Sequence, residues 1–159
     1  MKTATAKEVR DELKYRTDDE LRAIILRLSR FKKENKELLS YLLFEAHHEE
    51  EYIENVKKLI DEKLLAINTS NGYYAKKAVR RILKETKKYV RYSGSKETEV
   101  SLLIHFCYSL QETHPSLLRL KIVRDIVQRQ IVLIKVRIST LHEDLQYDYE
   151  QELDKIDYH

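Results

Sequence analysis

The clearest chemical signal in the sequence is a concentration of positive charge between residues 73 and 92. Eight Lys and Arg residues of this segment are accompanied by a single acidic residue, Glu85. Most of them recur at intervals of three and four residues, which places them along one side of a helix. Such a helix can follow a phosphate backbone, and the tyrosines that flank the segment could stack on bases. The candidate residues for binding a polyanion or nucleic acid are Lys76, Lys77, Arg80, Arg81, Lys84, Lys87, Lys88 and Arg91.

Two other interpretations of this basic segment remain open from the sequence alone. The first is an ordinary solvent-exposed helix face, because an apolar stripe that includes Val79 and Ile82 would lie on the opposite side. The second is neutralisation by the acidic residues 143–157, which could lie along the basic helix of the same molecule or of a second copy. Whether the basic side chains are exposed or covered would discriminate between these interpretations.

A metal site is the next chemistry to consider, because His47 and His48 lie among several glutamates. Glu45 and His48 have the Glu-x-x-His spacing that di-iron helical bundles use. Those bundles need the motif on two helices, and this sequence has it once. We therefore predict no metal site and no cofactor.

Enzymatic signatures are missing from the sequence. Cys107 lies on an apolar helical stripe, where a lone thiol behaves as a small hydrophobic residue, and His105 points elsewhere. Two separated glycines exclude a Gly-rich phosphate-binding loop or a dinucleotide fingerprint. There is also no nucleophile elbow of the Gly-x-Ser-x-Gly type. We predict that the protein is not an enzyme.

The composition indicates helices as the elements that position these residues. The 159 residues include only two glycines and one proline, which turn-rich and strand-rich folds need repeatedly. Charged residues make up 36% of the chain, and the formal net charge of +3 is mild. The lone Cys107 allows no disulfide within one chain, and the apolar runs are too short to span a bilayer. We expect a protein of a reducing compartment, located in the cytoplasm.

Apolar periodicity near 3.6 residues divides the chain into seven amphipathic segments. A loose repeat between the segments that contain residues 21–25 and 79–83 favours stacked hairpins. The predicted fold is therefore all-α, with six or seven antiparallel helices in a HEAT-like solenoid or an irregular bundle. We expect one domain over residues 1–146 and an acidic, tyrosine-containing tail over residues 147–159. The predicted helices lie at about 5–15, 17–31, 36–46, 49–67, 73–92, 95–110 and 116–145.

The last of these helices predicts an interface. Its residues 131–138 are rich in β-branched side chains and could alternate as a strand, but their length and spacing favour a helix. Four consecutive apolar residues from Ile131 occupy more than a full turn, so the helix is either central in the core or shared with another chain. Tyrosines in the tail suggest that it docks on its own domain or on a partner. The predicted interface residues are Ile131, Val132, Tyr147 and Tyr149.

Residues 30–47, 91–99 and 141–149 resemble a group of small bacterial all-helical proteins of unassigned function. The resemblance extends over most of the chain and implies a bacterial cytoplasmic protein, but no activity, ligand or catalytic residue. The residues themselves favour a non-catalytic protein-interaction or scaffold module. Its partner would be another protein or a second copy, with no membrane involved. Binding of nucleic acid through the basic helix 73–92 is the alternative.

Overall fold

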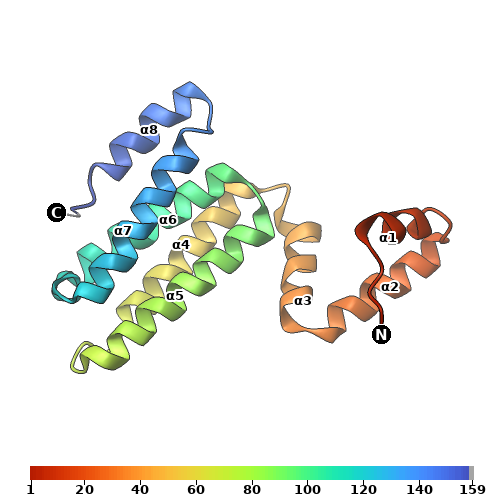
Figure 1. Ribbon diagram of the computed structural model, residues 1–159, viewed down its shortest axis with the longest axis horizontal. Coiled ribbons are helices and arrows are strands. Elements are labelled where there is room, and N and C mark those ends of the chain that lie inside the picture. The colour runs from red at the N-terminus through yellow and green to blue at the C-terminus, as the bar shows by residue number, and fades with distance from the viewer. Residues whose placement is uncertain (158–159) are drawn as a thin grey trace. The chain divides into compact units, whose positions relative to one another are not determined.

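The computed structural model describes residues 1–157, and these residues form eight α-helices and no β-strand (Figure 1). The prediction of an all-α fold is confirmed. The helices number eight rather than six or seven, because the segment predicted as one helix over residues 116–145 is divided. Among the described residues, no helix combines the length and the apolar character that crossing a membrane requires.

The chain divides into two compact units, one of residues 1–44 and one that begins at residue 45. The sequence prediction placed a boundary later, between residues 146 and 147. These two residues are consecutive in helix α8, Glu143–Leu153, so the predicted tail begins inside a helix. Tyr158 and His159, which the predicted tail includes, lie outside the described residues.

The first unit contains three helices: α1 (Ala6–Leu13), α2 (Asp18–Phe31) and α3 (Lys33–Ser40). Thr5 begins α1 with a reciprocal capping box, in which Glu8 Oε2 accepts from the Thr5 backbone N–H at 2.7 Å. Thr17 begins α2 by accepting from the Glu20 backbone N–H at 3.2 Å. Extended backbone at Lys32 joins α2 to α3 as a hairpin, and a π-helical turn η1 (Tyr41–Glu45) follows.

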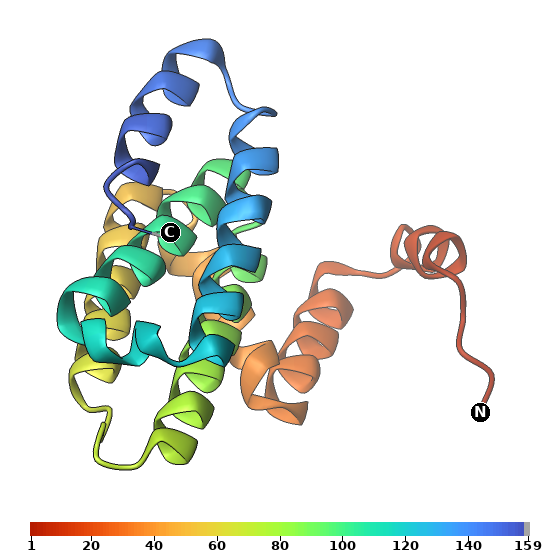
Figure 2. The ribbon, with the colours of Figure 1, turned by 60° about the vertical axis from the view of Figure 1, so that its left-hand side comes forward.

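The second unit is a bundle in which consecutive helices run antiparallel (Figures 1 and 2). Helix α6 (Lys96–Thr113) lies at its centre and packs against the four other helices of the bundle. This position follows from its sequence, since the buried residues of α6 are distributed around most of its circumference. The remaining elements are α4 (Glu49–Leu65), α5 (Gly72–Ser93), the 3₁₀ turn η2 (Pro115–Arg119), α7 (Lys121–Ile138) and α8.

Polar and glycine caps fix both ends of the basic helix α5. The Asn71 side chain accepts from the backbone N–H of Tyr73 at 3.0 Å and of Tyr74 at 3.4 Å. At the other end Gly94 adopts a left-handed φ of 70°, which glycine reaches without steric strain. The observed helix Gly72–Ser93 extends one residue beyond the predicted range 73–92 at each end.

The prediction of one helix over residues 116–145 is wrong in its limits. Pro115 begins the 3₁₀ turn rather than the long helix, and extended backbone at Leu120 separates that turn from α7. Helix α7 ends at Ile138, where Ser139 Oγ donates to the Val136 carbonyl at 2.6 Å and Thr140 Oγ1 donates to the Arg137 carbonyl at 2.7 Å. Hydroxyls that bond to the preceding turn compete with helical hydrogen bonding. Residues 131–138 are helical, as predicted.

Candidate functional site

The basic residues of α5 form one exposed surface of the second unit. Six of the eight predicted side chains are exposed, while Lys76 and Lys88 are half-buried. The opposite side of the helix packs into the bundle through Ala75, Val79 and Ile82, which are almost fully buried. We call the exposed set the basic face; it consists of Lys77, Arg80, Arg81, Lys84, Lys87 and Arg91.

Local contacts reduce the negative charge beside this basic face. Glu85 is the one acidic residue of α5, and its Oε2 lies 2.5 Å from the Lys63 ammonium of α4. This ion pair offsets the Glu85 charge with a cation from outside the face. The Lys77 ammonium lies 4.5 Å from the centre of the Tyr73 ring, a cation–π contact that retains the positive charge.

The acidic tail packs on a different side of the bundle from the basic face. Residues 143–157 form α8 and the turn that follows, and α8 packs against α6 and α7. Figure 1 shows α8 and α5 on opposite sides of the bundle. Leu153 and Ile156 are buried, and the Tyr149 hydroxyl donates to Glu97 Oε1 at 3.0 Å. In the described residues, neutralisation of the basic face by the tail of the same molecule is therefore not observed.

The four predicted interface residues have different environments. Ile131 is 3% exposed and belongs to the core of the bundle, whereas Val132 is 64% exposed. Tyr147 is exposed, and Tyr149 is half-buried against α6 through its bond to Glu97. Burial and the nearby Glu97 carboxylate raise the pKa of Tyr149 above its usual range. Ile131 is thus buried within its own chain, and of the four predicted residues only Val132 and Tyr147 are exposed.

Substitutions at two neighbouring residues of α7 test whether Ile131 is buried in the core while Val132 is exposed. Ile131→Ala is expected to lower the free energy of unfolding by about 2–5 kcal/mol, because it removes buried side-chain volume. Val132→Ala is expected to change it by less than about 0.5 kcal/mol, because that side chain is largely exposed. Urea denaturation followed by circular dichroism measures both. Equal destabilisation by the two variants would contradict the assignment.

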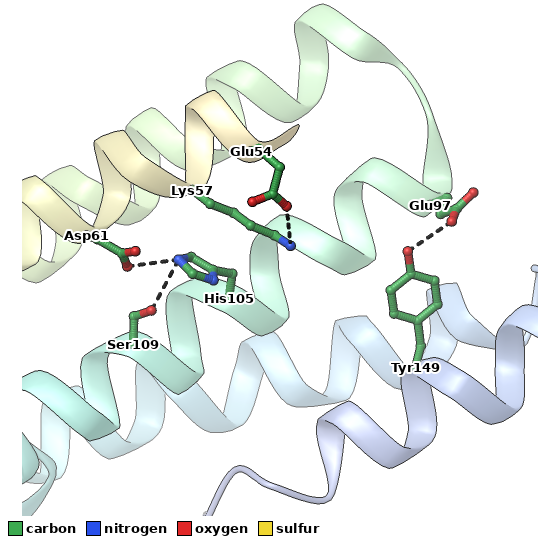
Figure 3. A network of polar contacts seen from close by, with 7 residues as sticks. All are labelled: Glu54, Lys57, Asp61, Glu97, His105, Ser109 and Tyr149. Atoms are coloured by element: carbon green, nitrogen blue, oxygen red, sulfur yellow. Dashed lines mark hydrogen bonds and ion pairs between the residues drawn. The ribbon is translucent and has the colours of Figure 1, made fainter. Parts of the chain in front are cut away.

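A polar network between α4 and α6 contains the residue types of a catalytic triad (Figure 3). His105 Nε2 lies 2.8 Å from Asp61 Oδ1 and 3.2 Å from Ser109 Oγ. A triad needs the carboxylate on one ring nitrogen and the serine on the other, so that one nitrogen donates while the other accepts a proton. Here both contacts share one nitrogen. The network therefore links α4 to α6 and lacks the two-sided geometry of a triad.

The histidines considered for a metal site are exposed and lie in the segment before α4. Glu45 is half-buried at the end of the π-helical turn. Within residues 1–157, no three His, Cys, Asp or Glu side chains are placed close enough together to hold a metal ion.

No protein-family model, curated protein or solved structure matches this chain. What the protein binds therefore has to be inferred from its own surfaces.

An apolar groove in the first unit was not predicted from the sequence. It lies between α2 and α3, has a volume of about 340 Å³, and is lined mostly by aliphatic side chains. Asn35 closes the end of the hairpin, where its Nδ2 donates to the Leu28 carbonyl at 2.8 Å. We call this surface the hairpin groove; it is lined by Ile25, Leu28, Ser29, Asn35, Leu38, Leu39 and Leu42.

The sequence contained a signal for this groove, but the signal was ambiguous. The apolar stripes of both helices were expected to face a core, as amphipathic stripes usually do. In the structure Leu28 is 56% exposed and Leu42 is 53% exposed. Periodicity shows that a helix has an apolar face, but not what covers that face.

Proposed function

We propose that this protein is a non-catalytic interaction module that self-associates through the hairpin groove. The observation that carries the proposal is the mostly aliphatic lining of the groove, in which Ile25, Leu28, Leu38 and Leu42 remain exposed. Contiguous exposed apolar surface of this kind marks protein-binding sites.

The energetics of the first unit favour an occupant for the groove. Among residues 1–44, only Ser29 and Tyr41 are buried, so the unit has almost no aliphatic core of its own. Units of this size gain little stability from folding alone and often depend on oligomerisation. Covering a large aliphatic side chain contributes about 1.5–3 kcal/mol. Burial of the groove residues would therefore stabilise the hairpin as well as the complex.

A second copy of the chain fits this surface chemically. The hairpin carries an apolar groove and, on the same short stretch, the protruding side chains of Phe31, Leu43 and Phe44. In a two-fold dimer the same surface of both copies forms the interface. The protruding side chains of one copy can therefore enter the groove of the other copy, and the reverse contact forms at the same time. Residues 18–40 contain six basic and five acidic residues, and this near balance limits repulsion between identical surfaces.

The molecular mass in solution tests self-association. We expect the wild-type protein to elute with twice the 19.1 kDa mass of one chain in size-exclusion chromatography with light scattering. Leu28→Glu is expected to give the monomeric mass, because it places a charge in the apolar groove without disturbing a buried position. Leu65→Glu is the matched control, since Leu65 is an exposed leucine of α4.

Two results would contradict this proposal. A wild-type protein that remains monomeric at high micromolar concentration has no self-association to explain. A Leu65→Glu variant that dissociates as readily as Leu28→Glu would place the interface elsewhere. Circular dichroism of each variant establishes that the helices are retained, so that a change of mass reports the interface.

A further inference from the structure

We propose that the basic face of α5 binds single-stranded nucleic acid, with its cations on the phosphates and with Tyr73 and Tyr74 stacked on bases. This site is separate from the hairpin groove and does not depend on self-association. Proteins that bind single strands combine a track of positive charge with aromatic rings. Helix α5 presents both features on surface that is open to solvent.

The charge track has the length of several nucleotides. Lys77 and Arg91 begin and end the basic face, and a rise of about 1.5 Å per residue separates their backbones by about 21 Å. Successive cations of the face are at most four residues apart along the helix. A flexible phosphate chain can follow such a track by adjusting its own torsions.

Packing within the bundle leaves this face free for a ligand. The opposite side of α5 packs into the core, where Val79, Ile82 and Thr86 are buried. The Thr86 hydroxyl donates to the Ile82 carbonyl at 2.9 Å and so needs no partner from another helix. The acidic helix α8, which could have competed with nucleic acid, is held against α6 and α7. Helix α8 of the same molecule thus provides no acidic cover for the track.

Two exposed tyrosines at the start of α5 favour a single-stranded over a double-stranded nucleic acid as the ligand. Tyr73 is 57% exposed and Tyr74 is 64% exposed, and their rings meet edge to face with centroids 5.5 Å apart. The Asn71 cap fixes the backbone of both residues in the first turn. Base faces are available for stacking in single strands, whereas they are covered by neighbouring bases in a duplex. The rings therefore favour a single-stranded ligand.

Fluorescence anisotropy with a labelled oligothymidylate, measured over a series of salt concentrations, tests the charge track. The variant Lys77→Gln/Arg80→Gln/Lys84→Gln removes three cations from the basic face. The control Lys121→Gln/Arg129→Gln/Lys135→Gln removes three exposed cations from α7 and gives the same net charge. We expect the first variant to reduce the slope of log K against log salt by about 2, at about 0.7 per phosphate contact. The control is expected to retain the wild-type slope.

The aromatic part of the proposal has its own measurement. Tyr74→Ala is expected to weaken oligothymidylate binding roughly tenfold with little change in the salt slope, because it removes stacking and no charge. A duplex of the same length is expected to bind more weakly than the single strand. Three results would overturn the proposal: no binding of the single strand at low salt, equal losses in the two triple variants, or duplex binding as tight as single-strand binding.

Discussion

Replacing Phe106 by alanine is expected to lower the free energy of unfolding of the helical bundle by about 3–5 kcal/mol. Phe106 is fully buried in α6, the helix that packs against all the other helices of the second unit. Removing its ring leaves a cavity that no single neighbouring helix can fill by a local shift, because each neighbour is also packed elsewhere. Chemical denaturation followed by circular dichroism gives the change directly.

A neighbouring aromatic residue of the same helix provides the control. Tyr108 follows two positions later and is 38% exposed. Its replacement by alanine removes a similar ring from the same helix with a smaller loss of buried contact. We expect a clearly smaller effect on the free energy of unfolding than for Phe106→Ala. Equal destabilisation of the two variants would contradict the difference in burial between Phe106 and Tyr108.

Local chemistry allowed the sequence to predict most helix boundaries. Helices were predicted to begin near residues 5, 17 and 95, and the hydroxyls of Thr5, Thr17 and Ser95 accept from backbone N–H groups of the first turn. The basic helix was predicted to end near residue 92, and Gly94 follows it in the left-handed conformation that suits a helix end. Such signals involve residues three or four positions apart, so they need no knowledge of the tertiary structure.

The boundaries that were missed depend on weaker or less specific signals. The end of α7 has no glycine or proline and relies on the hydroxyls of Ser139 and Thr140, which helices also tolerate in their interiors. The apolar periodicity continued through this region as far as Leu141, so it gave no reason to divide the helix. Separate helices were consequently predicted as one.

The candidate sites show the same division between local and tertiary information. The alignment of the basic residues along α5 follows from spacing alone and could be predicted. Its exposure depends on where the acidic tail docks, and that is set by the apolar residues Leu153 and Ile156, which bury against the bundle. Charge complementarity between the acidic tail and the basic helix α5 suggested instead that the tail lies along α5. Burial of apolar surface determined the docking site, because exposed ion pairs contribute little.

The second large effect is expected at alkaline pH and arises from Cys107. This thiol is fully buried in α6, and burial raises its pKa from 9.0 to about 12. In the unfolded chain the thiol loses its proton near pH 9, whereas in the folded protein it keeps the proton up to about pH 12. Between these values the unfolded state binds fewer protons, so the free energy of unfolding falls as the pH rises. The expected loss is about 1.4 kcal/mol per pH unit, or about 4 kcal/mol over the whole interval.

Comparison with Cys107→Ala isolates this contribution from the other groups that titrate at alkaline pH. Tyr149, whose raised pKa acts in the same direction, is present in both proteins and cancels in the difference. The alanine variant loses some packing at every pH, but that loss is independent of protonation. We therefore expect urea denaturation at increasing pH to give curves that converge above pH 9, with the wild type losing stability faster. Parallel curves would mean that the thiol ionises without unfolding, and Cys107 would then have to be accessible to water in the folded bundle.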